Sequence, residues 1–560
     1  LDSLDGSTGF KVSGINGFDG LGFSVAGGGD INGDGLDDFM ISAYGYDQPV
    51  GYAGATYVIF GRTDAFAATL DINSLDGTDG FRIEGAGAGD RSGHAVASGD
   101  FNGDGFADVI VGANFASGSE HYSGSAFVVF GHDGSFTPTL SLSAPEVLRI
   151  DGAVSGDYAG FALASAGDIN GDGYDDIIIG ATGVDAGEGT AAGAAYVVFG
   201  HAEPFTTMNL GALDGATGFR INGAAADQQL GAVVSGGGDV NGDGYADLII
   251  GASLADVGDH TDAGASYVLF GHAGSFAANI ATSDLNGSNG LRLAGVTAND
   301  QSGIAVSIAG DVDGDGYDDM LVGASAADNG AGPNNGSAYV IDGRDFTGGV
   351  AWQGSGGADV LKGDASDEIL IGGLGADSLD GGAGHDVLRG GAGNDVLVWD
   401  REDRLVDGGG GADTLRIARG GADLTEGGPA LRGIERIDLG VAGSNSLTLN
   451  ATAVRALGDQ PRLTVDGDSA DFVNLHGLWS NQGEQLPGYV RFASHGAVVD
   501  VAKSIAVVND GLIALTNLDA RLGLALGGVA AGDNTGVSVA GAGGVNGDGF
   551  ADFIIGASGA

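Results

Sequence analysis

The chain has 560 residues, of which 113 are glycine and only 8 are proline, and no strict three-residue glycine period is present, which excludes collagen. A hydrophobic fraction of 43% is too high for a disordered acidic tail. The formal net charge of -54 repels nucleic acid and anionic membranes and attracts divalent cations, of which calcium is the natural candidate.

The chain contains no cysteine, which excludes disulfides, thiolate metal sites and cysteine nucleophiles. No apolar run approaches the roughly 18 residues of a membrane-spanning helix, so we expect no membrane span. The sequence starts at Leu1 inside a repeat and stops at Ala560 just before the next expected strand. We therefore expect a fragment of a longer protein.

In chain order, the first recurrent element is the string DINGDGLDD at Asp30. It returns as DFNGDGFAD, DINGDGYDD, DVNGDGYAD and DVDGDGYDD at steps of about 70 residues, beginning at Asp100, Asp168, Asp239 and Asp311. Each copy is preceded by a strand pattern such as GFSVA and followed by apolar strand patterns such as DLIIGA, YVVFG and GFRIEG. Four short strands per repeat are typical of a propeller blade.

A sixth copy, GVNGDGFAD at Gly544, lies roughly 160 residues further on than this repeat predicts. The distance from the end of one YVVFG pattern to the next GF pattern is normally short, but in the fifth repeat it runs from Gly343 to Gly523. We therefore predict an insert between the third and fourth strands of the fifth blade. The expected divisions are propeller blades at 1–345, a β-roll at 346–416, a β-rich cap at 417–515, and a return to a final, truncated blade at 516–560.

Inside the insert, the period changes to nine residues. The strings GSGGADVLK, GDASDEILI, GGLGADSLD, GGAGHDVLR and GGAGNDVLV follow one another from Gly354 to Val398, and GGGGADTLR begins at Gly408 after a charged spacer. Such nonapeptides are typical of a parallel β-roll, in which glycines form tight turns and one apolar side chain points inward. From Arg416 onward the strand patterns are weaker, and a short helix is expected at 451–457.

The 70-residue repeats carry the residue types that calcium requires. Calcium takes six to eight oxygen ligands, so its loop needs several carboxylates at alternating positions and a glycine for a sharp turn. In the first loop, Asp30, Asn32, Asp34 and Asp38 supply side chains and Leu36 supplies a carbonyl. The corresponding residues of the next four loops are Asp100, Asn102, Asp104, Phe106 and Asp108; Asp168, Asn170, Asp172, Tyr174 and Asp176; Asp239, Asn241, Asp243, Tyr245 and Asp247; and Asp311, Asp313, Asp315, Tyr317 and Asp319.

Two other interpretations of these loops fit the sequence less well. An EF-hand needs a bidentate Glu at position 12, where these loops have strand residues such as Ile41 and Ile250. Simple Asx and glycine turns would explain one copy but not five with four ligand positions kept. We therefore predict calcium loops that connect two β-strands.

The remaining candidate ligands belong to weaker or different sites. Gly544 replaces the first aspartate of the sixth loop, which leaves a weaker site of Asn546, Asp548 and Asp552. In the nonapeptides, the sixth-position aspartates are expected to bind calcium between successive turns, with the last of them the weakest candidate: Asp359, Asp377, Asp386, Asp395 and Asp413.

These residues resemble two known families. The YVIFG, FVVFG, YVVFG and YVLFG patterns, with VGA or IGA, resemble the FG-GAP repeats of integrin α-subunit propellers over about residues 1–343 and 516–560. The nonapeptides resemble the RTX repeats of proteins exported by bacterial type I secretion. The resemblance implies an all-β propeller of six to seven blades with an inserted parallel β-roll, calcium loops on one propeller face, and an extracellular or cell-surface location in a Gram-negative bacterium.

No catalytic motif accompanies the repeats, because the sequence has no GxSxG, no HExxH and no phosphate loop. We predict a non-enzymatic, calcium-binding adhesion or recognition protein whose partner is an extracellular protein or glycan. The alternatives are an accessory region of a larger secreted hydrolase and a self-assembling surface-layer or matrix protein. Tyr44, Tyr46, Phe115 and Tyr122 are candidate ligand contacts, and packing between blades is the equal alternative.

Overall fold

The computed structural model describes residues 4–509 with short gaps, together with the backbone of two later strands, 535–543 and 552–557. The gaps are 7, 15, 48–49, 119, 186–190, 203, 329–333, 418–420, 426–429, 441–443, 459–460 and 495. The described part consists almost wholly of strands, with one α-helix, α1 (Ala451–Leu457), and two short 3₁₀ turns. The predicted all-β class and the predicted helix are confirmed. No helix in this described part is long and apolar enough to cross a membrane.

Four antiparallel sheets have the four-stranded pattern of propeller blades, and their strands lie in chain order. They are β2 (Leu21–Gly29), β3 (Asp38–Ala43), β4 (Ala55–Ile59) and β6 (Gly80–Glu84); β7 (Val96–Gly99), β8 (Asp108–Ala113), β9 (Ser125–Val129) and β11 (Leu148–Asp151); β12 (Ala159–Gly167), β13 (Asp176–Ala181), β14 (Ala194–Val198) and β16 (Gly218–Asn222); and β17 (Val233–Gly238), β18 (Asp247–Ala252), β19 (Ala265–Leu269) and β21 (Gly290–Ala294).

The fifth sheet has three described strands, β22 (Ser302–Ile308), β23 (Met320–Ala324) and β24 (Ser337–Ile341). The fourth strand that the sequence predicts near Gly523 lies outside the described residues. The later strands β44 (Thr535–Gly543) and β45 (Asp552–Ala557) form an antiparallel pair and match the first two strands expected of the final blade. The number of blades stays a prediction.

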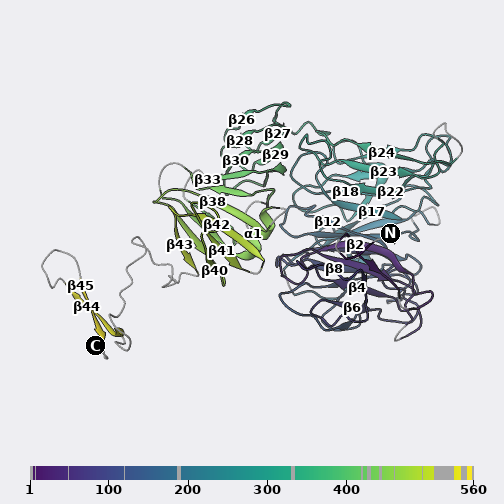
Figure 1. The fold of residues 1–560 in the computed structure, drawn as a ribbon. Coiled ribbons are helices and arrows are strands. Elements are labelled where there is room, and N and C mark those ends of the chain that lie inside the picture. Colours follow the sequence, from purple (N-terminus) through teal and green to yellow (C-terminus); the bar gives the residue numbers. More distant parts are fainter. Residues whose placement is uncertain are drawn as a thin grey trace.

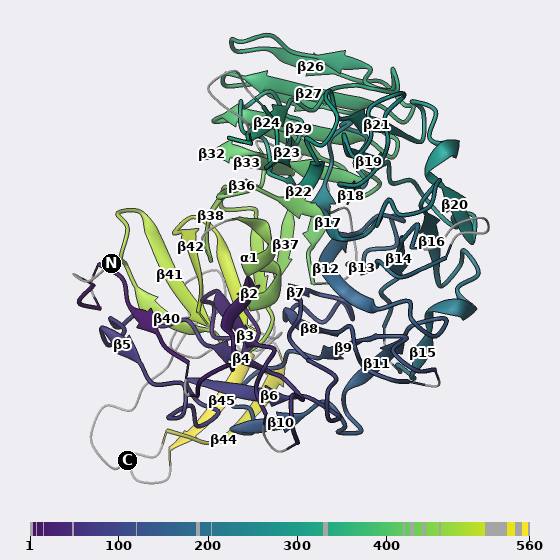
Figure 2. The same cartoon turned by 90° about the vertical axis from the view of Figure 1, so that its right-hand side faces the viewer.

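Neighbouring sheets follow one another along an arc, and their first strands β2, β7, β12, β17 and β22 lie side by side (Figure 2). The connection to a fourth strand also adds a short parallel strand to the preceding sheet: β10 (Thr139–Ser141) joins β6, β15 (Met208–Asn209) joins β11, and β20 (Asn279–Ala281) joins β16. The pair β1 (Lys11–Val12) and β5 (Thr69–Leu70) repeats this arrangement. Because the second, third and fourth sheets are covered on both faces, their middle strands, such as β8 and β9, are buried at every residue, which explains their continuous apolar sequence.

The insert forms a parallel roll beside the blades (Figure 1). One ladder contains β25 (Trp352–Gln353), β27 (Ile369–Leu374), β29 (Val387–Gly393), with β32 (Gly410–Gly411) pairing at its end, β31 (Leu405–Asp407) and β35 (Ala430–Arg432). The other contains β26 (Val360–Lys362), β28 (Ser378–Asp380), β30 (Val396–Trp399), β33 (Thr414–Ile417), β36 (Arg436–Asp438), β38 (Arg462–Asp466) and β42 (Ala497–Ala502). Successive nonapeptides therefore alternate between two sheets, and their inward apolar residues are fully buried in one core: Leu370, Leu379, Leu388, Leu397, Val406 and Leu415.

The parallel ladders do not stop at residue 416, where the sequence predicted the start of a cap. β33 pairs with β36, β36 with β38 and β38 with β42, all parallel. A third parallel sheet joins this part, with β34 (Ala422–Asp423), β37 (Ser446–Leu449), β39 (Phe472–Leu475) and β43 (Ala506–Asn509). Among the described residues of 417–509, antiparallel pairing is confined to β40 (Ser480–Gly483) with β41 (Tyr489–Ser494) and to β41 with β42, so this region consists mainly of strands that continue the roll.

Candidate calcium sites

Each predicted calcium loop connects the first and second strands of a sheet. In the first loop, the Asp30 carboxylate accepts hydrogen bonds from the backbone N–H groups of Asp34 (3.0 Å) and Gly35 (2.9 Å), and Asn32 Oδ1 accepts one from Asp34 N–H (2.9 Å). Gly33 and Gly35 have positive φ of 74° and 87°, which glycine adopts without strain. The chain thus wraps around the polar side chains, and the same bonds recur in the other four described loops.

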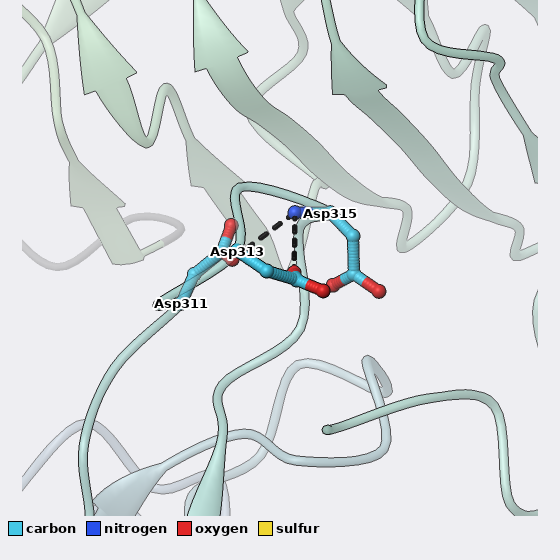
Figure 3. A group of neighbouring side chains, drawn as sticks. All are labelled: Asp311, Asp313 and Asp315. Carbon is cyan, nitrogen blue, oxygen red and sulfur yellow. Dashed lines mark hydrogen bonds between the residues drawn. The ribbon is translucent and has the colours of Figure 1, made fainter. Parts of the chain in front are cut away.

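The fifth loop brings three carboxylates together. Asp311, Asp313 and Asp315 each offer an oxygen within 4.8 Å of the others, and Asp315 N–H donates to both of its partners (Figure 3). Burial, followed by the charges of Asp313 and Asp311, raises the pKa of Asp315 to about 6. A divalent cation would relieve this repulsion, so the residues present fit a calcium ion.

The ninth-position aspartate ties the loop to the glycine of the FG pattern. Asp38 Oδ1 accepts from Gly61 N–H (2.8 Å) and Oδ2 accepts from Ile31 N–H (2.9 Å). Burial raises the pKa of Asp38 to about 7 and that of its counterpart Asp108 to about 8. Each carboxylate oxygen keeps a second lone pair, so these bonds leave the ligand role open while they also anchor the turn.

The sequence predicts that the seventh-position residue supplies a carbonyl ligand. In the structure, the aromatic side chain at this position of the second to fifth loops also packs on a glycine of the preceding loop. An added Cβ on Gly33 would lie 2.4 Å from the Phe106 ring, and one on Gly103 would lie 2.6 Å from the Tyr174 ring. Tyr245 and Tyr317 pack in the same way on the glycines of the preceding loops. Consecutive loops are therefore in contact, which sequence spacing alone did not predict.

In the roll, four predicted ligands are half-satisfied carboxylates. Asp377, Asp395 and Asp413 form a row before β28, β30 and β33 of one ladder, whereas Asp386 precedes β29 of the other ladder. Asp377, Asp386, Asp395 and Asp413 are at most 2% exposed. One oxygen of each accepts the backbone N–H located 18 residues earlier, at 2.7 to 2.8 Å, whereas the other oxygen is buried without a hydrogen-bond partner. Buried anionic oxygens need a partner, and calcium is an oxygen-binding cation that fits these four positions.

The ends of the row differ from the sequence prediction. Asp359 is partly exposed, and Ser355 N–H and Oγ both donate to its Oδ2 at 2.7 Å, which lowers its pKa. Asp413, the weakest candidate by sequence, is fully buried and arranged like the other three. Burial raises the pKa of Asp413 to about 7, and that of Asp395 to about 6.

Two acidic residues of the roll were missed. The charged spacer WDREDRLVD is itself nine residues long, and its β31 pairs with β29 in the regular register, so a count of the frame could have found it. Its Asp403 is 4% exposed, has one oxygen without a partner, and has a pKa raised to about 8 by burial and by Asp386 and Asp400. Glu435 accepts a hydrogen bond from Asp413 N–H at 2.8 Å, as the aspartate 18 residues later does in a regular coil. Because Glu435 follows Asp413 by 22 residues, the nonapeptide frame does not predict it.

The sixth loop is only partly described. Asn546 and Asp548 lie outside the described residues, and Asp552 is described as backbone at the start of β45. Its ligand role stays a prediction.

The candidate ligand-contacting aromatics differ in exposure. Tyr46 is 6% exposed and belongs to a core, whereas Tyr122 is 41% exposed and lies edge-on to Phe115, which also packs on Tyr158. These residues lie in the connections between second and third strands and between successive sheets, at the ends of the strands opposite the calcium loops.

Comparison with known proteins identifies both repeat types. The FG-GAP repeat matches residues 21–59, 92–129, 159–198, 230–269 and 302–341, and the RTX calcium-binding nonapeptide repeat (4 copies) matches 353–379 and 363–397.

Three curated relatives match the chain over part of its length. Phosphatidylinositol-glycan-specific phospholipase D of Rattus norvegicus is 34% identical over 155 residues, 27% of this chain and 17% of that protein. Integrin alpha-PS5 of Drosophila melanogaster is 32% identical over 168 residues, 30% of this chain and 15% of that protein. Integrin alpha-4 of Xenopus laevis is 34% identical over 182 residues, 31% of this chain and 16% of that protein. The chain thus spans between 15% and 17% of these relatives, and it contains FG-GAP repeats and RTX calcium-binding nonapeptide repeats.

Proposed function

We propose that this chain is part of a secreted calcium-binding adhesion or recognition protein, in which calcium stabilises the propeller loops and the roll. The observation that carries the proposal is the buried carboxylate oxygen without a partner on each of Asp377, Asp386, Asp395 and Asp413. A bound calcium ion supplies positive charge and takes oxygen ligands, while the chain holds the carboxylates in place through backbone N–H groups.

Several features support an extracellular setting and the absence of catalysis. Extracellular calcium modules bind with dissociation constants of about 10⁻⁴ to 10⁻³ M, which suits sites that fill after export. The two repeat types are generally found in non-enzymatic segments, and the RTX resemblance favours type I secretion from a Gram-negative bacterium. The calcium ligands in the propeller are proposed to be those named from the sequence in the loops between first and second strands, apart from the fourth loop, which has a different counter-charge.

A substitution in the middle of the row tests calcium binding. Asp395→Asn removes one charge from the row, so we expect at least one fewer bound calcium ion and a smaller rise of melting temperature on calcium addition. Asp438→Asn is the matched control, because Asp438 pairs with Arg416 away from the row. Equal calcium binding by both variants and the wild type would contradict the proposal.

The recognition surface is proposed at the loops opposite the calcium loops. Tyr52 is 58% and Tyr122 41% exposed, and both have positive φ (55° and 52°), a strained conformation for tyrosine. Arrays of glycans and extracellular proteins, probed with calcium-loaded protein, test this surface. Tyr122→Ala should weaken a captured ligand, whereas Tyr339→Ala on β24, with the same 41% exposure, should not. Equal loss in both variants would argue against this location.

The similarity to phosphatidylinositol-glycan-specific phospholipase D supports a second candidate, an accessory region of a larger secreted hydrolase. Sequencing of the complete gene separates the two, because a hydrolase requires a catalytic domain outside the repeats.

A further inference from the structure

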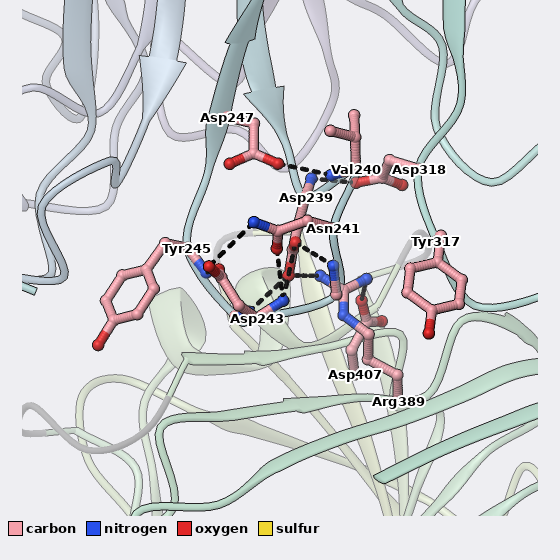
Figure 4. A network of polar contacts seen from close by, with 12 residues as sticks. Asp239, Val240, Asn241, Asp243, Tyr245, Asp247, Tyr317, Asp318, Arg389 and Asp407 are labelled. Atoms are coloured by element: carbon pink, nitrogen blue, oxygen red, sulfur yellow. Dashed lines mark hydrogen bonds and ion pairs between the residues drawn. The ribbon is translucent and has the colours of Figure 1, made fainter. Parts of the chain in front are cut away.

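An arginine of the roll enters the fourth calcium loop of the propeller (Figure 4). Arg389 is the last residue of the nonapeptide GGAGHDVLR and lies on β29. Its Nη2 donates to Oδ2 of Asp239, the first predicted ligand of this loop, at 2.7 Å. The two side chains are only 5% and 3% exposed, so the ion pair is shielded from water.

The same guanidinium connects three parts of the molecule. Its Nη1 lies 3.5 Å from Asp407 Oδ2 on the next coil of the roll, and 3.5 Å from the carbonyl oxygen of Gly316 in the fifth loop. Asp318, from the fifth loop, accepts the backbone N–H of Asp239 at 2.7 Å. Arginine suits such a position because its planar, permanently charged group presents several donors at once.

A second arginine and two apolar side chains cover the rest of the loop. Arg404 Nη1 donates to the carbonyl oxygen of Asp243 at 2.9 Å, and its guanidinium lies 4.8 Å from the centre of the Tyr245 ring. An added Cβ on Gly242 would lie 2.9 Å from Ile371, and one on Gly244 would lie 2.6 Å from Val387, both from the roll. The roll therefore contacts the fourth loop at several residues.

The third loop has the same internal structure without this cover. Its Asp168 accepts the N–H groups of Asp172 (2.9 Å) and Gly173 (2.8 Å), as Asp239 accepts those of Asp243 (3.1 Å) and Gly244 (2.6 Å). Among the residues that the structure describes, however, no lysine or arginine forms an ion pair with a carboxylate of the third loop. The difference between the two loops is thus the cation that the roll supplies.

We propose that the fourth loop is the docking socket of the roll, in which Arg389 supplies the positive charge that a calcium ion supplies in the third loop. Buried carboxylates need a counter-charge, and here the guanidinium already provides it at hydrogen-bond distance. A divalent cation on the same carboxylate would be repelled by this neighbour in a site of low effective dielectric. The inference rests on the proposed calcium function of the other loops.

Two matched substitutions test the socket in the full chain. Asp172 and Asp243 occupy the fifth position of the third and fourth loops, and each accepts the same two bonds, from the seventh-residue N–H and from the asparagine amide. Equilibrium dialysis at millimolar calcium would measure the number of calcium ions bound per chain. Asp172→Asn should lose one ion per chain and Asp243→Asn none, and loss of one ion from both variants would overturn the proposal.

Removal of the arginine supplies a second readout. In calcium, Arg389→Met should raise amide hydrogen exchange at 239–247 at least several-fold and allow one additional calcium ion to bind. Arg432→Met is the control, because Arg432 pairs with Asp407 on the roll side of the same cluster. If neither aspartate variant loses an ion, the calcium function of the propeller loops is wrong, whereas faster exchange in Arg389→Met alone still supports docking. Unchanged exchange in Arg389→Met would refute the socket in either case.

Discussion

Removal of calcium is expected to unfold the roll before the propeller. The perturbation is titration with excess chelator. The free-energy cost of removing calcium follows from the four buried carboxylate oxygens without partners, at Asp377, Asp386, Asp395 and Asp413. An unsatisfied buried polar group costs about 1 to 3 kcal/mol, so these four cost roughly 4 to 12 kcal/mol when no cation is bound. A domain is stable by only about 5 to 15 kcal/mol, so this loss is comparable to its whole stability.

The propeller is expected to respond less. Its strands bury apolar cores such as the one that contains Ile110, Val128 and Ile177. The first- and ninth-position carboxylates of its loops accept backbone N–H groups on both oxygens, as Asp100 and Asp108 do. Circular dichroism and hydrogen exchange during a calcium titration measure the difference, with protection at 354–416 rising as calcium enters the millimolar range. Equal protection of this segment in excess chelator would refute the reasoning and leave the nonapeptides as a calcium-independent solenoid.

Three further predictions concern pH, the insert and the sixth loop. In chelator, the raised pKa values of Asp38 (about 7) and Asp108 (about 8) mean that protonation stabilises the folded state. The melting temperature should therefore fall from pH 5 to pH 8, and the increase caused by calcium should be larger at pH 8. A melting temperature in chelator that rises over this range contradicts the assignment. Deletion of residues 346–514 should leave a propeller that melts cooperatively in saturating calcium, and loss of its β circular dichroism would show that the insert boundary is wrong. Gly544→Asp restores a fourth side-chain ligand, so calorimetry should detect an added or tighter calcium site, whereas an unchanged isotherm would mean that another group already replaces this carboxylate.

The blades were predictable because their signal is local and repeated. A loop such as Asp30–Asp38 lies between two strand patterns, and burial on both sides makes the second and third strands continuously apolar. The nonapeptides were equally clear as far as Val398. Beyond that point, the turn of Trp399 to Asp407 lacks the glycines, so a regular coil was interpreted as a spacer although its length preserves the frame.

The contacts of the roll with the propeller could not be predicted from either repeat. Arg389 occupies the last position of its nonapeptide, where Lys362, Ile371, Asp380, Val398 and Arg416 stand in other copies, so this position varies and does not identify Arg389. Its partner Asp239 is 150 residues away in the chain and is indistinguishable by sequence from the first aspartates of the other loops. Only the packing of the two modules shows that this loop receives a buried arginine; Arg455 of the insert also lies 3.5 Å from Asp30 of the first loop, in a more exposed pair.

Within each module, the proposed cation ligands also contact the neighbouring repeat. In the propeller, Asp38 connects its loop to the FG glycine, and Phe106 of the next loop packs on Gly33. In the roll, Asp395 accepts the N–H of Asp377 from the preceding coil with one oxygen and has the other free for an ion. A cation that orders one turn therefore also orders the surface on which the next repeat packs. Since each repeat contacts its neighbours in this way, binding at one site should stabilise the adjacent ones, and calcium should order both modules progressively along the chain.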